Sequence, residues 1–149
     1  MIVLPSAIGS EELLGRGIFD SRKAKHAQRG KIPPSVFRER SGVRELSVDR
    51  LSFGGHDQIS ALHDAERSGQ RFHGWATLKA ADACRAGRIV EARPIETINP
   101  YHAEIVLPEF IGPDIDEEQE QHALNLAMAA TWLARPTPRT YTEDPAKNS

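Results

Sequence analysis

The clearest pattern in the chain is an alternation of hydrophobic and polar residues over residues 101–107, directly after the turn signal Asn99-Pro100. In an extended strand, successive side chains point to opposite faces of the sheet. His102 and Glu104 therefore share one face. The opposite face carries the side chains of Tyr101, Ala103, Ile105 and Leu107. The pattern predicts a strand with one buried apolar face and one face that presents two proton-active groups.

Shorter patterns predict three further strands, at residues 45–51, 71–78 and 88–93. Helical spacing and capping residues predict a short helical turn at 10–14 and helices at 21–28, 57–67, 80–86 and about 114–134. The last helix begins with a cluster of acidic residues, which complement the positive end of the helix dipole. Its apolar stripe consists of Ala123, Leu126, Ala127, Ala130 and Leu133.

This order of elements favours an α+β fold with a single mixed or mainly antiparallel sheet of about four strands, packed by helices, and a long C-terminal helix. Residues 1–135 are expected to form one globular domain, because cores are commonly built from about 100–150 residues. Residues 136–149 are polar and interrupted by prolines, so we expect a flexible C-terminal tail.

Composition supports a globular chain, since 39% of the 149 residues are hydrophobic and 27% are charged. The single cysteine excludes an internal disulfide framework. The apolar run at residues 1–4 is too short for a secretory or membrane-spanning segment. We therefore expect a cytoplasmic protein with no membrane partner.

Charge is distributed unevenly along the chain, although the formal net charge is only −2. Nine of the nineteen Lys and Arg residues lie between Arg16 and Arg44, whereas residues 109–122 contain acids and no Lys or Arg. The candidate residues for binding nucleic acid or another anion are Arg16, Arg22, Lys23, Lys25, Arg29, Lys31, Arg38 and Arg40. Alternatively, part of this basic region docks onto the acidic start of the last helix, within the chain or across a dimer.

A candidate catalytic site combines His102, Glu104 and Arg50. His102 and Glu104 would lie about 7 Å apart along one strand, close enough to serve one ligand. Histidine exchanges protons near neutral pH, and a nearby carboxylate can orient its ring. Arg50 shares a strand face with Leu46 and Val48, so its guanidinium needs an acidic partner or an anionic ligand if that face is buried. The alternative is that His102 and Glu104 simply face solvent.

Metal and cofactor binding are not expected. The six histidines show neither the i,i+4 helical spacing nor the short Cys/His pairing that is typical of zinc sites. The chain also lacks a glycine-rich phosphate loop and the Gly-x-Ser-x-Gly motif of a hydrolase nucleophile.

Three segments together resemble a group of small uncharacterised bacterial proteins. These segments are Leu46-Ser47-Val48-Asp49-Arg50-Leu51, Phe72-His73-Gly74-Trp75-Ala76 and Asn99-Pro100-Tyr101-His102-Ala103-Glu104-Ile105. The likeness covers roughly residues 10–107 and implies a bacterial cytoplasmic protein. It implies no reaction, cofactor or catalytic residue.

Three functional hypotheses follow from the sequence. The first is a noncatalytic binding or accessory protein that recognises an anionic partner, either nucleic acid or an acidic protein surface, through the basic N-terminal region. The second is a small enzyme that acts on a phosphate-containing substrate, such as a nucleotide or RNA, with the His102, Glu104 and Arg50 site. The third is a homo-oligomeric structural or immunity-type protein whose basic and acidic ends pair between copies.

Overall fold

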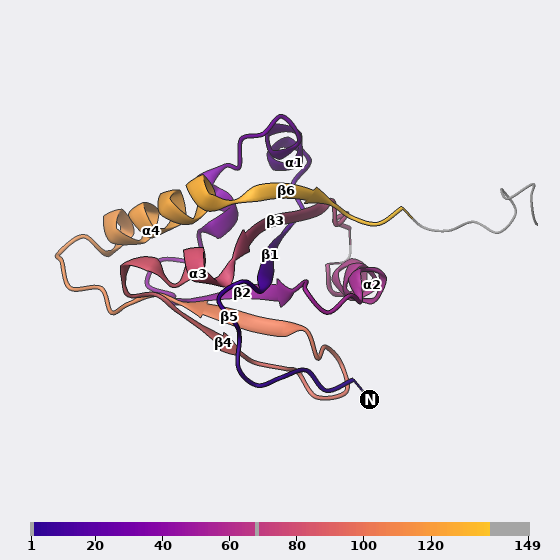
Figure 1. The fold of residues 1–149 in the computed structure, drawn as a ribbon. Helices are drawn as coiled ribbons and strands as arrows, with labels where there is room; N and C mark the ends of the chain where they lie inside the picture. The colour runs from indigo at the N-terminus through magenta and orange to yellow at the C-terminus, as the bar shows by residue number, and fades with distance from the viewer. Residues whose placement is uncertain (1, 68, 138–149) are drawn as a thin grey trace, which may run out of the picture.

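The computed structural model describes residues 2–67 and 69–137, which form an α+β fold around one antiparallel sheet (Figure 1). The sheet has six strands in the order β4-β5-β2-β1-β3-β6. Their bounds are β1 Leu13–Ile18, β2 Glu45–Arg50, β3 Gly74–Lys79, β4 Ile89–Ala92, β5 His102–Val106 and β6 Thr131–Ala134. The predicted single sheet is confirmed, but the expectation of about four strands is wrong.

Helices cover both faces of the sheet. Their bounds are α1 Ser21–Gln28, α2 His56–Glu66, α3 Ala80–Ala83 and α4 Ile115–Ala129, with 3-10 turns η1 Pro34–Phe37 and η2 Arg85–Gly87. The larger core cluster joins α1, η1, α3 and α4 to one sheet face. The smaller cluster joins Ile59 of α2 to Phe72, Trp75 and Tyr101 on the other side, and Figure 1 shows α2 well apart from α1 and α4.

The first strand occupies the region where a short helical turn is predicted. Residues 10 and 11 form a turn, but residues 13–18 pair with β3 at six successive positions, so the prediction is wrong at residues 13 and 14. In the sequence, Gly15 suggests the end of a helical turn, but in the structure it has a packing role. A Cβ atom on Gly15 would lie 2.8 Å from Cδ1 of Trp75, so glycine lets the indole lie directly on β1.

The second unpredicted strand is β6, which the sequence assigns to the end of the last helix. The α4 helix ends at Ala129, and Ala130 adopts an extended conformation with φ −95° and ψ 152°. Trp132 then packs against the larger core cluster and Leu133 against the smaller one. The apolar residues at 132–133 therefore serve opposite faces of the sheet, which a helix ending at Ala134 would not allow.

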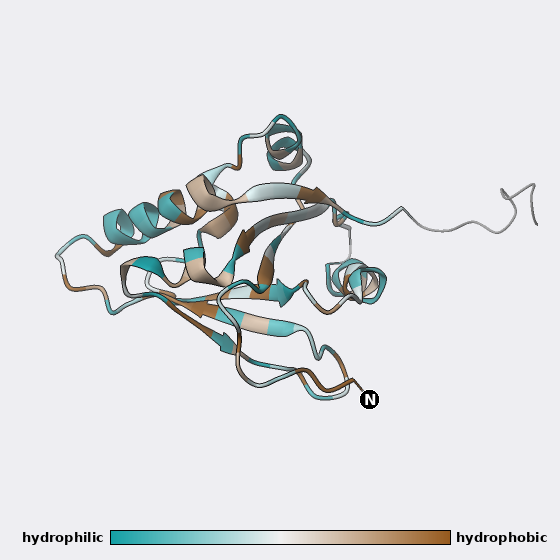
Figure 2. Ribbon diagram, viewed as in Figure 1, coloured by the Kyte–Doolittle hydropathy of each residue, from teal (hydrophilic) through white to brown (hydrophobic). Residues whose placement is uncertain are grey.

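Other predicted features agree with the structure. Ala103, Ile105 and Leu107 are buried on one side of the sheet, and His102 and Glu104 are half-buried on the other side of β5. Tyr101, which precedes β5, is buried in the smaller cluster and does not share their face as predicted. Asp114 caps α4, and Figure 2 shows hydrophilic residues over its first turns and hydrophobic residues nearer its end. Most of the predicted tail, 138–149, lies outside the described residues. Among the described helices, none is long and apolar enough to cross a membrane.

Candidate functional site

A cleft of about 610 Å³ opens where β1 and β2 separate. The two strands are in register only at Leu14 with Arg50 and at Gly15 with Asp49. Beyond Gly15, the guanidinium of Arg16 hydrogen-bonds to β2 in place of backbone hydrogen bonds between the two strands. Its Nη1 donates to the carbonyl oxygen of Ser47 at 2.9 Å, and its Nε donates to the carbonyl oxygen of Val36 at 3.0 Å. Arg16 therefore holds the gap open and lines it.

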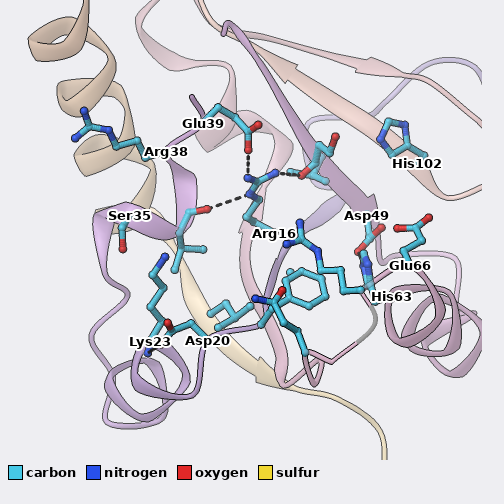
Figure 3. Close-up of a pocket in the computed structure, with 18 of the residues that line it drawn as sticks. Arg16, Asp20, Lys23, Ser35, Arg38, Glu39, Asp49, His63, Glu66 and His102 are labelled. Atoms are coloured by element: carbon cyan, nitrogen blue, oxygen red, sulfur yellow. Dashed lines mark hydrogen bonds and ion pairs between the residues drawn. The ribbon is translucent and has the colours of Figure 1, made fainter. Parts of the chain in front are cut away.

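Ionisable side chains from several elements converge on this cleft (Figure 3). The cationic residues are Arg16, Lys23, Arg38 and Arg67, and the acidic residues are Asp20, Glu39, Asp49 and Glu66. Two histidines, His63 and His102, also line it. Figure 3 shows Arg16 in the middle, with Lys23 and Asp20 on one side and His63 and Asp49 on the other.

The best-ordered group in the cleft is a hydrogen-bonded pair formed by Asp49 and His63. Asp49 lies on β2 and is only 3% exposed. Its Oδ2 lies 2.6 Å from Nε2 of His63 on α2 and accepts a second hydrogen bond, at 2.8 Å, from Nε1 of Trp75 on β3. The His63 ring also packs against Phe19 and Phe72, with centroid distances of 5.3 and 4.7 Å. One hydrogen bond and two aromatic contacts therefore hold this imidazole in one orientation.

This geometry defines where the imidazole carries its proton. The indole N–H of Trp75 can only donate, and an ionised carboxylate can only accept. A neutral His63 therefore donates to Asp49 through Nε2 and keeps its lone pair on Nδ1. A histidine that a buried carboxylate orients in this way is equipped to take up and return a proton.

The charges around the cleft are only partly neutralised by other side chains. Arg16 forms an ion pair with Glu39, and Arg38 forms one with Glu120 of α4. In the part of the chain that the structure describes, Lys23 and Arg67 have no carboxylate partner. The guanidinium of Arg67 instead lies 4.0 Å from the centroid of the Phe19 ring.

Asp20 lines the cleft beside Lys23 but has a separate structural task. Its side chain accepts hydrogen bonds from the backbone N–H groups of Arg22 and Lys23 and thereby caps α1. The bond from the backbone of Lys23 lowers the pKa of Asp20 below its ordinary value. Its negative charge therefore stays on the helix cap across the neutral pH range, and the ammonium of Lys23 forms no ion pair with it.

Of the three predicted catalytic residues, only His102 lines this cleft. It is the cross-strand partner of Asp49, so the two side chains leave the sheet on the same face. Nδ1 of His102 donates to the carbonyl oxygen of Arg93 at 2.8 Å, which leaves Nε2 as its free ring nitrogen. Glu104 is the cross-strand partner of Ser47 and lies 4.0 Å from Nη1 of Arg93.

The expected convergence of Arg50 with His102 and Glu104 is wrong, because Arg50 projects from the opposite face of β2. It is 1% exposed, and Glu12 binds it through two hydrogen bonds of 2.6 and 2.9 Å. Nη1 also donates to the carbonyl oxygen of Pro5 at 2.7 Å. Arg50 is therefore fully engaged inside the protein.

The predicted anion-binding residues lie in three places. Arg16, Lys23 and Arg38 reach the cleft, and the ion pair of Arg38 with Glu120 confirms that part of the basic region docks onto the last helix within the chain. Arg40 is exposed beside α4, where its carbonyl oxygen accepts from the side-chain amide of Gln119. The remaining residues are exposed on or just after α1, and they are Arg22, Lys25, Arg29 and Lys31.

Sequence patterns do not single out Asp49, His63 and Trp75 as a group. Asp49 lies in a strand, and His63 lies on the side of a helix with no recognisable motif around it. The one available signal is the position of Asp49 within the predicted strand at residues 45–51, since a strand residue that becomes buried is seldom an aspartate. Such a residue needs a hydrogen-bonding partner, but the sequence does not say which one.

Comparisons with protein-family models, curated proteins and solved structures give no match. Within residues 2–67 and 69–137, no group of three or more His, Cys, Asp and Glu side chains is arranged to hold a metal ion. The chemistry open to the described cleft is proton transfer by His63 and His102 and charge stabilisation by Arg16, Lys23 and Arg67.

Proposed function

We propose that this protein is an enzyme that binds a phosphate ester in the cleft between β1 and β2 and transfers a proton through His63. The observation that carries this proposal is the hydrogen bond between His63 and the buried carboxylate of Asp49, which Trp75 also holds. This arrangement orients the imidazole of His63, and with Nε2 donating to Asp49, Nδ1 is the ring nitrogen that can accept a proton from a substrate.

A phosphate ester is the favoured substrate class because of the cations at the same cleft. Lys23 and Arg67 line it without a carboxylate partner among the described residues. Arg16 lies between Lys23 and His63 (Figure 3), and Arg67 lies over the Phe19 ring, which contacts His63. Positive groups placed where negative charge develops in the transition state lower the barrier to phosphoryl transfer. The site therefore combines a base with stabilisation of an anion.

Cleavage of 4-nitrophenyl phosphate, bis(4-nitrophenyl) phosphate and uridine 3′-(4-nitrophenyl phosphate), which carries a 2′-hydroxyl, tests this proposal. We expect the purified protein to cleave at least one of them, and His63→Gln to lower kcat by about 100-fold or more. His122→Gln is the matched control, because His122 lies on α4 outside the cleft and should leave kcat unchanged. Equal rates for the wild type and His63→Gln would overturn the proposal.

A second candidate is a noncatalytic module that recognises an anionic partner, favoured by the exposed cations of α1. It differs from the enzyme in one measurable respect, since it predicts binding of a polyanion without turnover of any phosphate ester. Pairing of basic and acidic ends between copies stays a prediction, and the ion pair of Arg38 with Glu120 already joins part of these regions within one chain.

A further inference from the structure

The outer face of α1 carries a row of cations beside the cleft. Arg22, Lys25 and Arg29 follow one another at spacings of three and four residues, so they form one stripe on the helix. Ala24 and Ala27 form the buried side of the helix, and the three cations are exposed. None of the ion pairs among the described residues includes a residue of this stripe.

The stripe lies on a helix that also contributes to the cleft. Lys23 belongs to the same helix and lines the cleft, as does the capping residue Asp20. From Arg22 to Arg29 the helix rises about 10 Å at ~1.5 Å per residue. A polyanion that enters the cleft would therefore find further cations along its path, which a small phosphate ester would not use.

The rim of the cleft also offers a flat surface of the kind that contacts nucleobases. The guanidinium of Arg67 stacks over the ring of Phe19 at 4.0 Å, and both residues line the cleft. Proteins that bind single-stranded RNA stack unpaired bases on aromatic rings and on arginine planes. The combination of charge and stacking distinguishes a nucleic acid from a simple phosphate.

Two imidazoles line this cleft. His63 bonds Asp49 directly, and His102 is the cross-strand partner of Asp49 on the adjacent strand. Cleavage of RNA needs two such groups, because one must remove a proton from the nucleophile and the other must protonate the leaving group. RNA also supplies its own nucleophile, the 2′-hydroxyl, which DNA lacks.

We infer that the substrate of the proposed enzyme is single-stranded RNA, held by the α1 stripe and cleaved at the cleft through its 2′-hydroxyl; this inference rests on the proposed function. Nδ1 of His63 takes the proton of the 2′-hydroxyl while the 2′-oxygen forms a bond to phosphorus. The bond from phosphorus to the 5′-oxygen breaks, and protonated His102 gives its Nε2 proton to that oxygen. The products are a 2′,3′-cyclic phosphate and a 5′-hydroxyl end, and Lys23 and Arg67 offset the charge on the phosphorus oxygens.

The test compares a labelled single-stranded RNA of about a dozen nucleotides, the same sequence as DNA, and a diribonucleotide. We expect both RNA substrates to be cleaved to a cyclic phosphate and the DNA to stay intact. In Lys25→Gln/Arg29→Gln, KM for the long RNA should rise about tenfold, whereas KM for the diribonucleotide should not change. His102→Gln should lower kcat by about 100-fold or more on both RNA substrates without this length dependence.

Lys79→Gln/Arg85→Gln is the matched control, because it also removes two exposed positive charges and leaves α1 unchanged. Binding of the uncleavable DNA should weaken as salt rises, since each cation that neutralises a phosphate adds ~0.7 to the slope of log K against log salt. The slope should therefore fall by about 1.4 in the α1 variant, which removes two such cations, and should not change in the control.

The possible failures are distinguishable. Cleavage of simple phosphate esters without cleavage of RNA overturns the inference and leaves the proposed function standing. An equal rise in KM for the long RNA in the α1 variant and in its control has the same consequence. Binding of RNA through α1 without cleavage of any phosphate ester overturns the proposed function and the cleavage step. Cleavage of the DNA at the rate of the RNA overturns the 2′-hydroxyl route.

Discussion

At the scale of single residues, the buried charges of Arg50 and Asp49 serve different purposes. Arg50 and Glu12 satisfy each other inside the fold, with additional bonds from Arg50 to the carbonyl oxygens of Pro5 and Ala7. Asp49 is equally buried but binds a histidine at the edge of a cleft. The first pair ties the N-terminal segment to β2, and the second leaves a titratable ring open to a ligand.

The pair of Arg50 with Glu12 predicts a large loss of stability when one partner loses its charge. Glu12→Gln should lower the free energy of unfolding by about 3 kcal/mol, because Arg50 would stay buried without a counter-ion. Glu11→Gln is the control, since Glu11 is exposed and pairs only with Lys79 at the surface; its effect should stay within about 0.5 kcal/mol. Urea unfolding of both variants checks this, and equal effects would contradict it.

At the scale of elements, local patterns predict the strands and helices whose signals are self-contained. The α1 helix has its cap and its two buried alanines within eight residues, and β5 has strict alternation, so both appear where the sequence predicts them. The strands β1 and β6 are different, because each depends on β3 as a partner. In the sequence, Gly15 suggests the end of a helix, whereas in the structure it makes room for the Trp75 ring. The apolar residues of β6 likewise extend the helical pattern of the preceding residues, but in the structure strand pairing directs them to opposite faces of the sheet.

The pairing of β6 with β3 gives a test at this scale. A Cβ atom on Gly74 would lie 2.4 Å from the carbonyl oxygen of Leu133, and Gly74 has a φ of +152°. Gly74→Ala should therefore push β6 from the sheet edge and lower the free energy of unfolding by about 1–3 kcal/mol. Gly9→Ala is the control, because its added Cβ atom would meet nothing within 4 Å. Thermal unfolding compares the two, and similar melting temperatures would mean that β6 is not held against β3.

At the scale of the whole molecule, the cleft is a product of strand order. The order β4-β5-β2-β1-β3-β6 places β2 between β5 and β1, so His102 comes to lie opposite Asp49 and Arg16 enters the gap beside them. The sequence singles out His102, which lines the cleft. It cannot indicate His63, because that assignment needs the packing of α2 over β2 and Trp75. The same topology explains why Arg50, one residue from Asp49, faces away.

The most direct test of the central claim is an NMR titration of the histidine rings with inorganic phosphate, using ¹⁵N-labelled protein and His63→Gln to assign the signals. We predict that neutral His63 carries its proton on Nε2 and that its ring signals shift saturably as phosphate binds. In Lys23→Gln/Arg67→Gln, the phosphate affinity reported by these signals should fall at least about tenfold. A neutral ring protonated on Nδ1, or His63 signals that phosphate does not move, would contradict a proton-transfer site for phosphate esters between β1 and β2.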